Sequence, residues 1–254
     1  MDGELGDLIA GIDRDFDLPA PNAAHAVRRR LQDAVSPALL LSTARRLLAN
    51  LTAESDAQYL YSDPAFRYGI EIFCWPPGFG NRPHLHLSWN VSAVLAGTID
   101  IFRSTVSAAD CLLASPLVAT AGEVGILIPP QFHFLKNNGT TSTITLHVFS
   151  ADSANGAAPT PEPRPLLAAK FSDDDLLAIV AASISWAGPQ AQDIVVAAFD
   201  LVKIDAKLSL MKMMATTDLS IAAMLARRLA ALVGGVDELR LMEIARGLES
   251  RVGE

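Results

Sequence analysis

The stretch "PPGFGNRPHLHLSWNVSAVLAGTIDIF", residues 76–102, contains two of the chain's five histidines, His84 and His86, one residue apart. A segment rich in Gly and Pro precedes them, and a long β-rich run follows. In an extended strand, alternate side chains project from the same face, so the two imidazoles point together while Leu85 points away. The stretch therefore predicts a β-strand that carries two histidines on one face, directly after a turn.

This strand belongs to a region of short β-rich runs that extends from Tyr59 to Phe149. Gly, Pro and Asn separate the runs, and no helical crossover lies between them, which is typical of an antiparallel sandwich or barrel. We therefore predict an antiparallel β-barrel over residues 58–150. Its further runs are YGIEIFCW, SPLVATAGEVGILIPP, QFHFLKNNGT and TSTITLHVFS.

The N-terminal segment, residues 1–57, has the apolar periodicity of short helices. Asn22 is a candidate N-cap for the second of them, and Pro37 stands where a proline is tolerated in the first turn of the third. His25, in the second helix, is expected at the surface.

The C-terminal part returns to helical periodicity after a linker. Residues 151–168 are small, polar and rich in proline, which predicts the linker. Residues 169–254 then predict a helical bundle, in which Ser172 and Asp175 form a capping-box pattern and Gly234 ends a helix. We expect a structural role for the bundle, including homo-oligomer formation.

Composition narrows the function and the compartment. The chain has 254 residues, and its 20 basic and 28 acidic residues give a formal net charge of -8, which disfavours nucleic-acid and anionic-membrane partners. Two cysteines, Cys74 and Cys111, are too few for a disulfide framework. The acidic N-terminus lacks a signal-peptide pattern, and no apolar run is long enough to span a membrane. A cytoplasmic protein is the expectation.

The two histidines are half of a candidate metal site, because neutral imidazole is a ligand for Fe, Zn, Cu and Ni. His133, on a later strand, is the expected third ligand, since antiparallel pairing can bring it alongside His84 and His86. Without context, a His-x-His pair is as often a surface feature. The apolar residues expected to wall the pocket are Leu85, Leu87, Phe132, Phe134 and Phe149.

The region resembles the cupin superfamily. Residues 76–97 are similar to the first cupin motif, with its Gly, His-x-His and later Gly. Residues 122–138, "GEVGILIPPQFHFLKNN", are similar to the second and include His133. The resemblance implies a small β-barrel with a metal site of His84, His86 and His133. The glutamate of the family would fall on Asn90 or Val91, and neither is a carboxylate.

Loss of that glutamate leaves three histidines, the arrangement of the cysteine dioxygenase family, which "CWPPGFGNRPHLH" also resembles. The resemblance implies Fe(II) as cofactor and a small-molecule thiol and O2 as reactants. The family has a Ser-x-His-x-Tyr relay beside the iron, and here the corresponding residues are Thr145, His147 and Phe149. His147 and Thr145 are therefore assigned catalytic roles, whereas Phe149 lacks the hydroxyl.

Substrate binding differs from the family pattern as well. Tyr61 stands about where the family has the Arg that holds the substrate carboxylate, so Tyr61 is assigned to catalysis and to substrate binding. Arg67 or Arg82 could replace the missing Arg, although both also fit solvated loop positions. Trp75 and Phe149 are further candidates for lining the substrate pocket, although an aromatic residue on a strand is more often core.

Three functions remain open from the sequence. The first is a cupin Fe(II) dioxygenase that acts on a small thiol or amino-acid-like substrate. The second is a metalloenzyme with Zn, Ni or Mn at the same histidines and a non-oxidative reaction. The third is a non-catalytic cupin that binds a metal or a ligand. Oxygen consumption separates the first from the other two.

Overall fold

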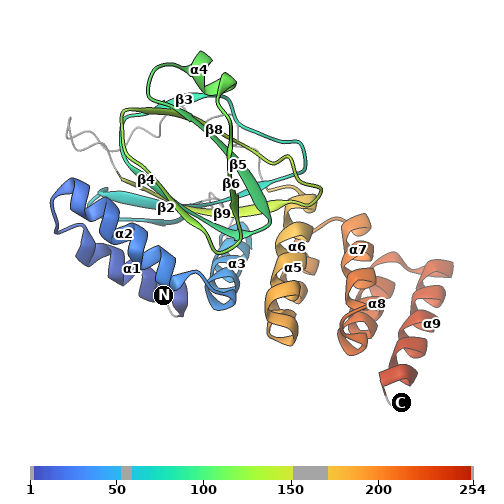
Figure 1. Ribbon diagram of the computed structural model, residues 1–254. Helices are drawn as coiled ribbons and strands as arrows, with labels where there is room; N and C mark the ends of the chain where they lie inside the picture. Colours follow the sequence, from blue (N-terminus) through green and yellow to red (C-terminus); the bar gives the residue numbers. More distant parts are fainter. Residues whose placement is uncertain (1–2, 53–58, 151–170, 253–254) are drawn as a thin grey trace. The chain divides into compact units, whose positions relative to one another are not determined.

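The computed structural model of the chain describes residues 3–52, 59–150 and 171–252 (Figure 1). The chain divides into two compact units, residues 1–170 and 171–254. The expected linker, residues 151–168, lies outside the described residues.

The first unit combines three helices with a β-barrel. Helix α3 begins at Pro37 as expected, but α2 begins at Ala20, so Asn22 is not its N-cap. Prolines are tolerated at a helix start, where the backbone amide lacks a helical partner, and Pro19 occupies the cap position. The elements are α1 (Glu4–Asp15), α2 (Ala20–Ala34), α3 (Pro37–Thr52), β1 (Tyr59–Ser62), β2 (Tyr68–Trp75), β3 (His84–His86), β4 (Asn90–Ala96), β5 (Thr98–Ser104), α4 (Ala108–Leu113), β6 (Leu117–Thr120), β7 (Val124–Leu127), β8 (Gln131–Lys136) and β9 (Thr143–Ser150).

The strands form two antiparallel sheets that face each other. One sheet has five strands in the order β1-β2-β9-β4-β7, and the other has four in the order β3-β8-β5-β6. Figure 1 looks into the barrel, with β5, β6 and β8 on one side and β2, β4 and β9 on the other. The predicted antiparallel barrel is therefore confirmed.

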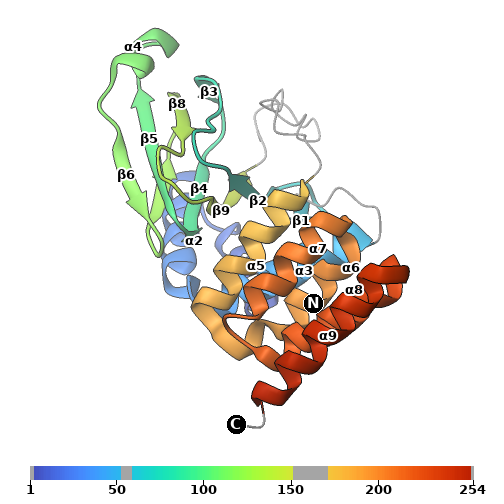
Figure 2. The ribbon, with the colours of Figure 1, turned by 90° about the vertical axis from the view of Figure 1, so that its right-hand side faces the viewer.

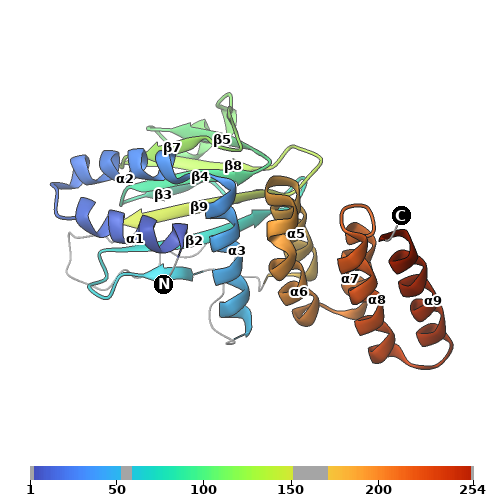
Figure 3. The same ribbon diagram turned by 90° about the horizontal axis from the view of Figure 1, so that it is seen from below.

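The outer face of the five-stranded sheet is apolar and covered. Ile70, Ile72, Val91, Leu146 and Val148 alternate along their strands and are all 0% exposed. Helix α2 packs on β4 and β7, and α3 packs on β1. Figure 3 shows α1 to α3 along this side of the barrel. Burial of these side chains, worth about 1.5–3 kcal/mol each, attaches the N-terminal helices to the sheet.

Hydrogen bonds from helix side chains strengthen this attachment. The guanidinium Nε of Arg28 donates to the carbonyl oxygen of Val124 (3.2 Å), and that of Arg46 donates to the carbonyl oxygen of Leu60 (3.1 Å). Both bonds join a helix of residues 3–52 to a strand, so the helices and the barrel form one folded unit.

One end of the barrel interior is filled by apolar side chains. Trp75, Val94, Ile99 and Leu135 form a buried cluster there. Gly97 makes the turn from β4 to β5 with φ 81°, and a Cβ at this position would meet Thr143 Oγ1 at 2.6 Å. Only glycine combines that backbone conformation with such a close approach. The apolar cluster closes this end of the barrel, so a binding site in the interior would lie toward the other end.

The second unit contains only helices among the described residues. The expected capping box is present, because Ser172 and Asp175 satisfy each other's backbone amides, and Gly234 caps α8 with φ 66°. Figure 2 shows the helices side by side, and Phe199, Leu210 and Leu225 are in their core. The elements are α5 (Asp173–Ala187), η1 (Gly188–Ala191), α6 (Gln192–Leu201), α7 (Ile204–Met214), α8 (Leu219–Val233) and α9 (Gly235–Val252).

None of the helices within residues 3–52, 108–113 and 171–252 has the length and apolar character that crossing a bilayer requires.

Candidate metal centre

Three histidines converge on the inner face of the four-stranded sheet. Strands β3 and β8 are antiparallel neighbours, and the register places His84 opposite His133 and His86 opposite Gln131. The Nε2 atoms of the three imidazoles lie 3.0 Å (His84 to His86), 2.8 Å (His86 to His133) and 3.1 Å (His133 to His84) apart. The structure thus brings together the three residues that the sequence proposed as ligands.

The size of this triangle fits a single metal ion. With metal–nitrogen bonds of about 2.1 Å, two nitrogens on one ion are about 3.0–3.4 Å apart. The observed Nε2 separations of 2.8–3.1 Å are close to this range, so one ion could contact all three nitrogens. Three protein ligands would leave positions on that ion for other ligands. The donor set therefore suits a transition metal with open positions.

The protonation of the imidazoles also suits metal binding. His84 Nδ1 donates to the carbonyl oxygen of Arg82 (2.9 Å), so Nδ1 bears a proton and Nε2 is the nitrogen that faces the cluster. Burial, helped by the neighbouring His84, lowers the pKa of His86 to about 4. Burial and the adjacent imidazoles lower the pKa of His133 well below its ordinary value. The rings of His86 and His133 are therefore neutral at pH 7, as metal ligands must be.

The cluster contains no carboxylate. Among the described residues, the group whose ligand atoms lie within 4.8 Å of one another consists of His84, His86 and His133 alone. Asn90 is buried on the inner face, with its Nδ2 3.5 Å from His147 Nδ1. Val91 belongs to the outer, helix-covered face. A metal held here would keep its full charge, because all three ligands are neutral.

A hydrogen-bonded chain lies next to the cluster. Trp75 Nε1 donates to Thr145 Oγ1 (2.7 Å), and Thr145 Oγ1 lies 2.8 Å from His147 Nε2. Burial and the nearby His86 lower the pKa of His147 to about 3, so this ring is also neutral. The Phe149 ring is parallel to the His147 ring, 5.5 Å away. His147 is thus held in place by its neighbours.

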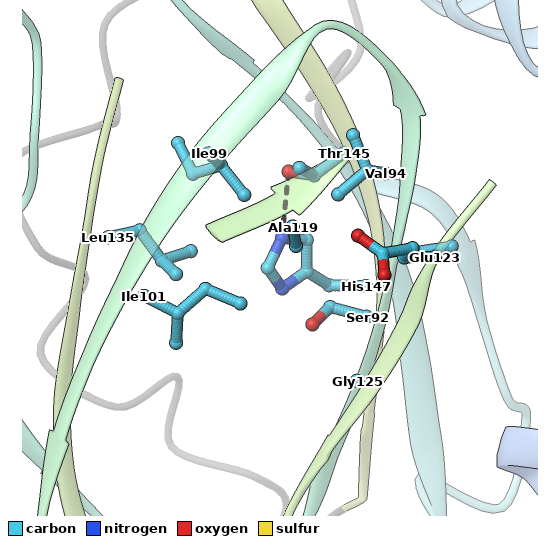
Figure 4. Close-up of a pocket in the computed structure, with 11 residues that line it drawn as sticks. Ser92, Val94, Ile99, Ile101, Ala119, Glu123, Gly125, Leu135, Thr145 and His147 are labelled. Atoms are coloured by element: carbon cyan, nitrogen blue, oxygen red, sulfur yellow. Dashed lines mark hydrogen bonds between the residues drawn. The ribbon is translucent and has the colours of Figure 1, made fainter. Parts of the chain in front are cut away.

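A small cavity adjoins His147. Figure 4 shows the ring of His147 pointing into it, with the bond to Thr145 drawn, Ile99, Ile101 and Leu135 on one side and Ser92 on the other. Its free space is about 20 Å³, enough for a single water molecule, with His147 and Ser92 as polar partners. The interior next to the histidines is therefore narrow.

The strand order decides the fold. Strands β2-β9-β4-β7 face strands β3-β8-β5-β6, which is the strand order of an eight-stranded jelly roll, and β1 extends one edge. The histidines lie on the inner face of this roll. The first unit therefore contains a jelly-roll barrel, which is the fold that the resemblance to cupins implied.

Comparisons with known proteins gave structural matches for this barrel at low sequence identity. No family model and no curated protein matches the chain. Similar solved structures include the Cnp3 cupin domain of Schizosaccharomyces pombe (13% identity, 36% of this chain and 57% of that chain, TM-score 0.31) and a cupin 2 conserved barrel domain protein of Salinispora arenicola (17%, 37% and 72%, TM-score 0.31). An oxalate oxidase matches at 22% identity, over 36% of this chain and 43% of that chain, with a TM-score of 0.30.

Tyr61 and Arg67 lie outside the barrel interior, away from the histidines. Tyr61 pairs with Ile70 and contacts Tyr68, on the helix-covered face of the five-stranded sheet. Arg67 forms ion pairs with Asp63 (2.9 Å) and Asp13 (3.0 Å). The structure therefore does not support their assignment as site residues. Tyr61 shares the face of its partner Ile70, which is directed at the helices, and Arg67 precedes β2 and is held by the two carboxylates.

The other proposed pocket residues are divided between the two faces. Phe149 is on the inner face with His147, and Trp75 is on it at the closed end. Arg82 is exposed and contacts His84 through its backbone carbonyl only. Four of the five predicted wall residues do not face the histidines: Leu87 is 62% exposed, Phe134 stacks on Phe102 on the outer face, and Leu85 and Phe132 alternate with the histidines along β3 and β8.

Sequence reasoning missed inner-face residues that only the register reveals. Glu71 and Ser92 lie in one row with His147, on the two strands that flank β9. Arg103 pairs with His133 across β5 and β8. No motif surrounds these residues in the sequence. Strand alternation predicts which residues share a face, but the pairing between strands, which the sequence does not show, was needed to place them beside the histidines.

Proposed function

We propose that the barrel is a cupin-type, non-haem Fe(II) dioxygenase that oxidises a small thiol or amino-acid-like substrate with O2. The observation that carries the proposal is the triangle of three imidazoles, His84, His86 and His133, without a carboxylate among them. Such a donor set supplies a metal face with open positions and uncompensated positive charge. Anionic donors, above all a thiolate, are the ligands that this charge favours.

When bound, the metal would supply a Lewis-acidic centre that deprotonates a coordinated thiol and allows O2 chemistry. The overall reaction proposed is R–SH + O2 → R–SO2H. Both oxygen atoms end on sulfur, the sulfur loses four electrons, and O2 gains four. The balance therefore requires no external reductant and no second cofactor.

The chain's own residues would position and enclose the reactants. His147 is neutral, and its Nδ1 faces the Nδ2 of Asn90, which can only donate, so the ring proton is on Nε2, directed at Thr145 Oγ1. Trp75 donates to Thr145 and orients that hydroxyl. Phe149, with its ring 6.4 Å from the ring of His86, takes a position beside the histidines without offering a hydrogen-bonding group. It would exclude water there.

The test begins with the metal content of the protein as purified, followed by O2 uptake of the Fe(II)-loaded protein. The probes are cysteine, cysteamine and 3-mercaptopropionate, with serine as a control that lacks the thiol. The expected result is about one iron per chain, thiol-dependent O2 uptake and a product with two added oxygen atoms. Zinc, nickel or manganese with no uptake would favour a non-oxidative enzyme, and ligand binding without turnover would favour a binding protein.

A further inference from the structure

Helix α9 has one covered side and one open side. Figure 3 shows it at the end of the row of helices in the second unit, and among the described residues α8 is its principal contact. Leu241, Ala245 and Leu248 are the buried residues of α9, and an ion pair of Arg227 with Glu249 (2.7 Å) also joins the two helices. The side of α9 turned away from α8 is exposed.

This exposed side, the outer face of α9, has large residues at one end and small ones at the other. A helix turns by about 100° per residue, so residues two positions from the buried ones lie on the far side. Val236 and Leu239 there are 68% and 65% exposed, although both are apolar. In sequence order, the outer face consists of Val236, Leu239, Glu243, Arg246, Gly247 and Ser250.

Gly247 lies in the interior of α9 without a reason inside the chain. Glycine disfavours a helix relative to other residues, and one common reason for keeping it is a close approach of another group. At Gly11 of α1 that reason is present, since a Cβ would meet Arg30 Cδ at 2.4 Å. A Cβ at Gly247 would meet no atom within 4 Å. The space above Gly247 is therefore free for a side chain of another molecule.

The sizes of the residues on the outer face are complementary to a second α9 in antiparallel orientation. Such an orientation places Val236 and Leu239 of one copy against Ser250 and Gly247 of the other, and the same contacts repeat at the opposite end. A symmetric dimer requires a self-complementary surface of this kind. In a parallel pair, the large residues would face large residues, and the small residues would leave a gap.

The charges of the outer face follow the same rule. Glu243 and Arg246 are close to the middle of α9, so an antiparallel second copy brings Glu243 of each copy within about one helical turn of Arg246 of the other. A parallel pair would set like charges together. Nucleic acid and anionic membranes do not fit this face, because they require an excess of Lys and Arg.

We propose that the outer face of α9 binds α9 of a second copy of this chain, in antiparallel orientation, to form a symmetric homodimer. The helix has 18 residues and is about 27 Å long, so this contact covers roughly 300 Å² on each copy. Stable interfaces bury about 800 Å² per partner. The dimer is therefore expected to be weak, with a Kd of about 10–100 µM, and to form in proportion to concentration.

Sedimentation equilibrium of the full chain, from about 1 to 300 µM, tests the proposal. Gly247→Leu fills the space between the copies and should weaken the dimer by about tenfold or more. Because leucine favours a helix and its Cβ meets no atom of the chain, the same variant should raise the urea midpoint of the dilute monomer. Ala181→Leu, at an exposed position on α5, is the matched control and should dimerise as wild type does.

Two further sets of variants test the apolar contact and the orientation. Leu239→Gln should weaken the dimer, whereas Leu112→Gln, at a position on α4 that is 61% exposed, should leave it unchanged. Glu243→Arg and Arg246→Glu should each weaken the dimer by about fivefold, since each places like charges together. The double variant Glu243→Arg/Arg246→Glu restores opposite charges and should recover the wild-type Kd.

Three results would overturn the proposal. A chain that stays monomeric up to about 300 µM has no dimer of the expected strength. An unchanged Kd in both Gly247→Leu and Leu239→Gln would place the interface elsewhere on the chain. Failure of the double charge variant to recover what the single variants lose would exclude the antiparallel pairing. Far-UV circular dichroism of each variant verifies that the helices are intact.

Discussion

Two polar clusters in the first unit differ in how their charges are balanced. Outside the barrel, Asp13, Asp63, Arg67 and Tyr68 join β2 to α1, and each donor has an acceptor. Arg67 holds the pKa of Asp63 below its ordinary value by donating hydrogen bonds to it, and burial raises the pKa of Tyr68. Inside the barrel, three imidazoles face one another with no opposite charge among them.

The difference separates a structural cluster from a candidate site. Complementary groups satisfy one another, so the outer cluster is complete as it stands. Three imidazole Nε2 atoms within 3.1 Å of one another face a common point, and this arrangement would be satisfied by a metal cation from outside the chain. A buried cluster of identical groups is therefore a better indicator of a binding site than a cluster whose donors and acceptors are already paired.

The largest effect is expected from His133→Ala. With three protein ligands available, removal of one leaves two, and metal affinity should fall by about a thousandfold, roughly 4 kcal/mol. Metal content after dialysis, measured by mass spectrometry, checks this. His25→Ala removes an exposed histidine of α2 and should keep the wild-type metal content. Full metal content in His133→Ala would show that the metal binds elsewhere.

The second effect is the pH dependence of stability in the metal-free protein. The pKa values of His86 and His147, about 4 and about 3, lie below those of unfolded histidine, so on acidification the unfolded chain takes up protons first. The free energy of unfolding should therefore fall as pH drops, by a total on the order of 3 kcal/mol between about pH 6.5 and pH 5. Urea denaturation at each pH measures it.

This pH window isolates the inner cluster from the outer one. The stabilisation by Asp63, whose pKa is lowered, is lost only on acidification below the ordinary carboxyl range of about pH 4. A flat stability profile between pH 6.5 and pH 5 would contradict the buried, neutral state of the two histidines.

A smaller effect is expected from Asp63→Ala, which breaks the outer cluster. Asp63 accepts from the backbone N, Nε and a terminal NH2 of Arg67, and its loss should destabilise the unit by roughly 2 kcal/mol. Thermal or urea denaturation measures this loss. Metal content of the folded protein should stay at the wild-type value, and a large loss of metal would show that the two clusters are coupled.

The smallest effect is expected from Thr145→Val. The substitution leaves Trp75 Nε1 and His147 Nε2 without their shared oxygen, at a cost of about 1 kcal/mol, and should slow turnover while the metal is retained. Thr145→Ser keeps the hydroxyl and should restore both properties. If Thr145→Val turns over at the wild-type rate, the orientation of His147 by Thr145 has no part in catalysis.

Local rules predicted much of the fold and the core of the site. The period of two placed His84 and His86 on one face, and the motif around His133 provided the third residue. The predicted helix start at Pro37 and the predicted capping box of Ser172 and Asp175 are confirmed, because helix starts and caps depend on residues close together in the sequence. At Asn22 the same rules were wrong, since the prolines nearby start the helix earlier.

What the sequence could not provide was the register between strands and the choice of inner face. Tyr61 follows an irregularity in the pairing of β1 with β2, and its direction depends on that irregularity. Arg103 is 30 residues from His133 in the sequence, and only the pairing of β5 with β8 makes them neighbours. Alternation shows which residues share a face of a strand, but long-range pairing decides which face is inside.

The apolar outer face of the five-stranded sheet has a consequence for any attempt to reduce this protein to its β-barrel. A chain cut to begin at β1 would expose a continuous plane of aliphatic side chains, including Ile70, Leu146 and Val148. Such a surface promotes aggregation in water. The helices before β1 cover this apolar surface and keep it from water. A fragment that contains the barrel should therefore also include these helices.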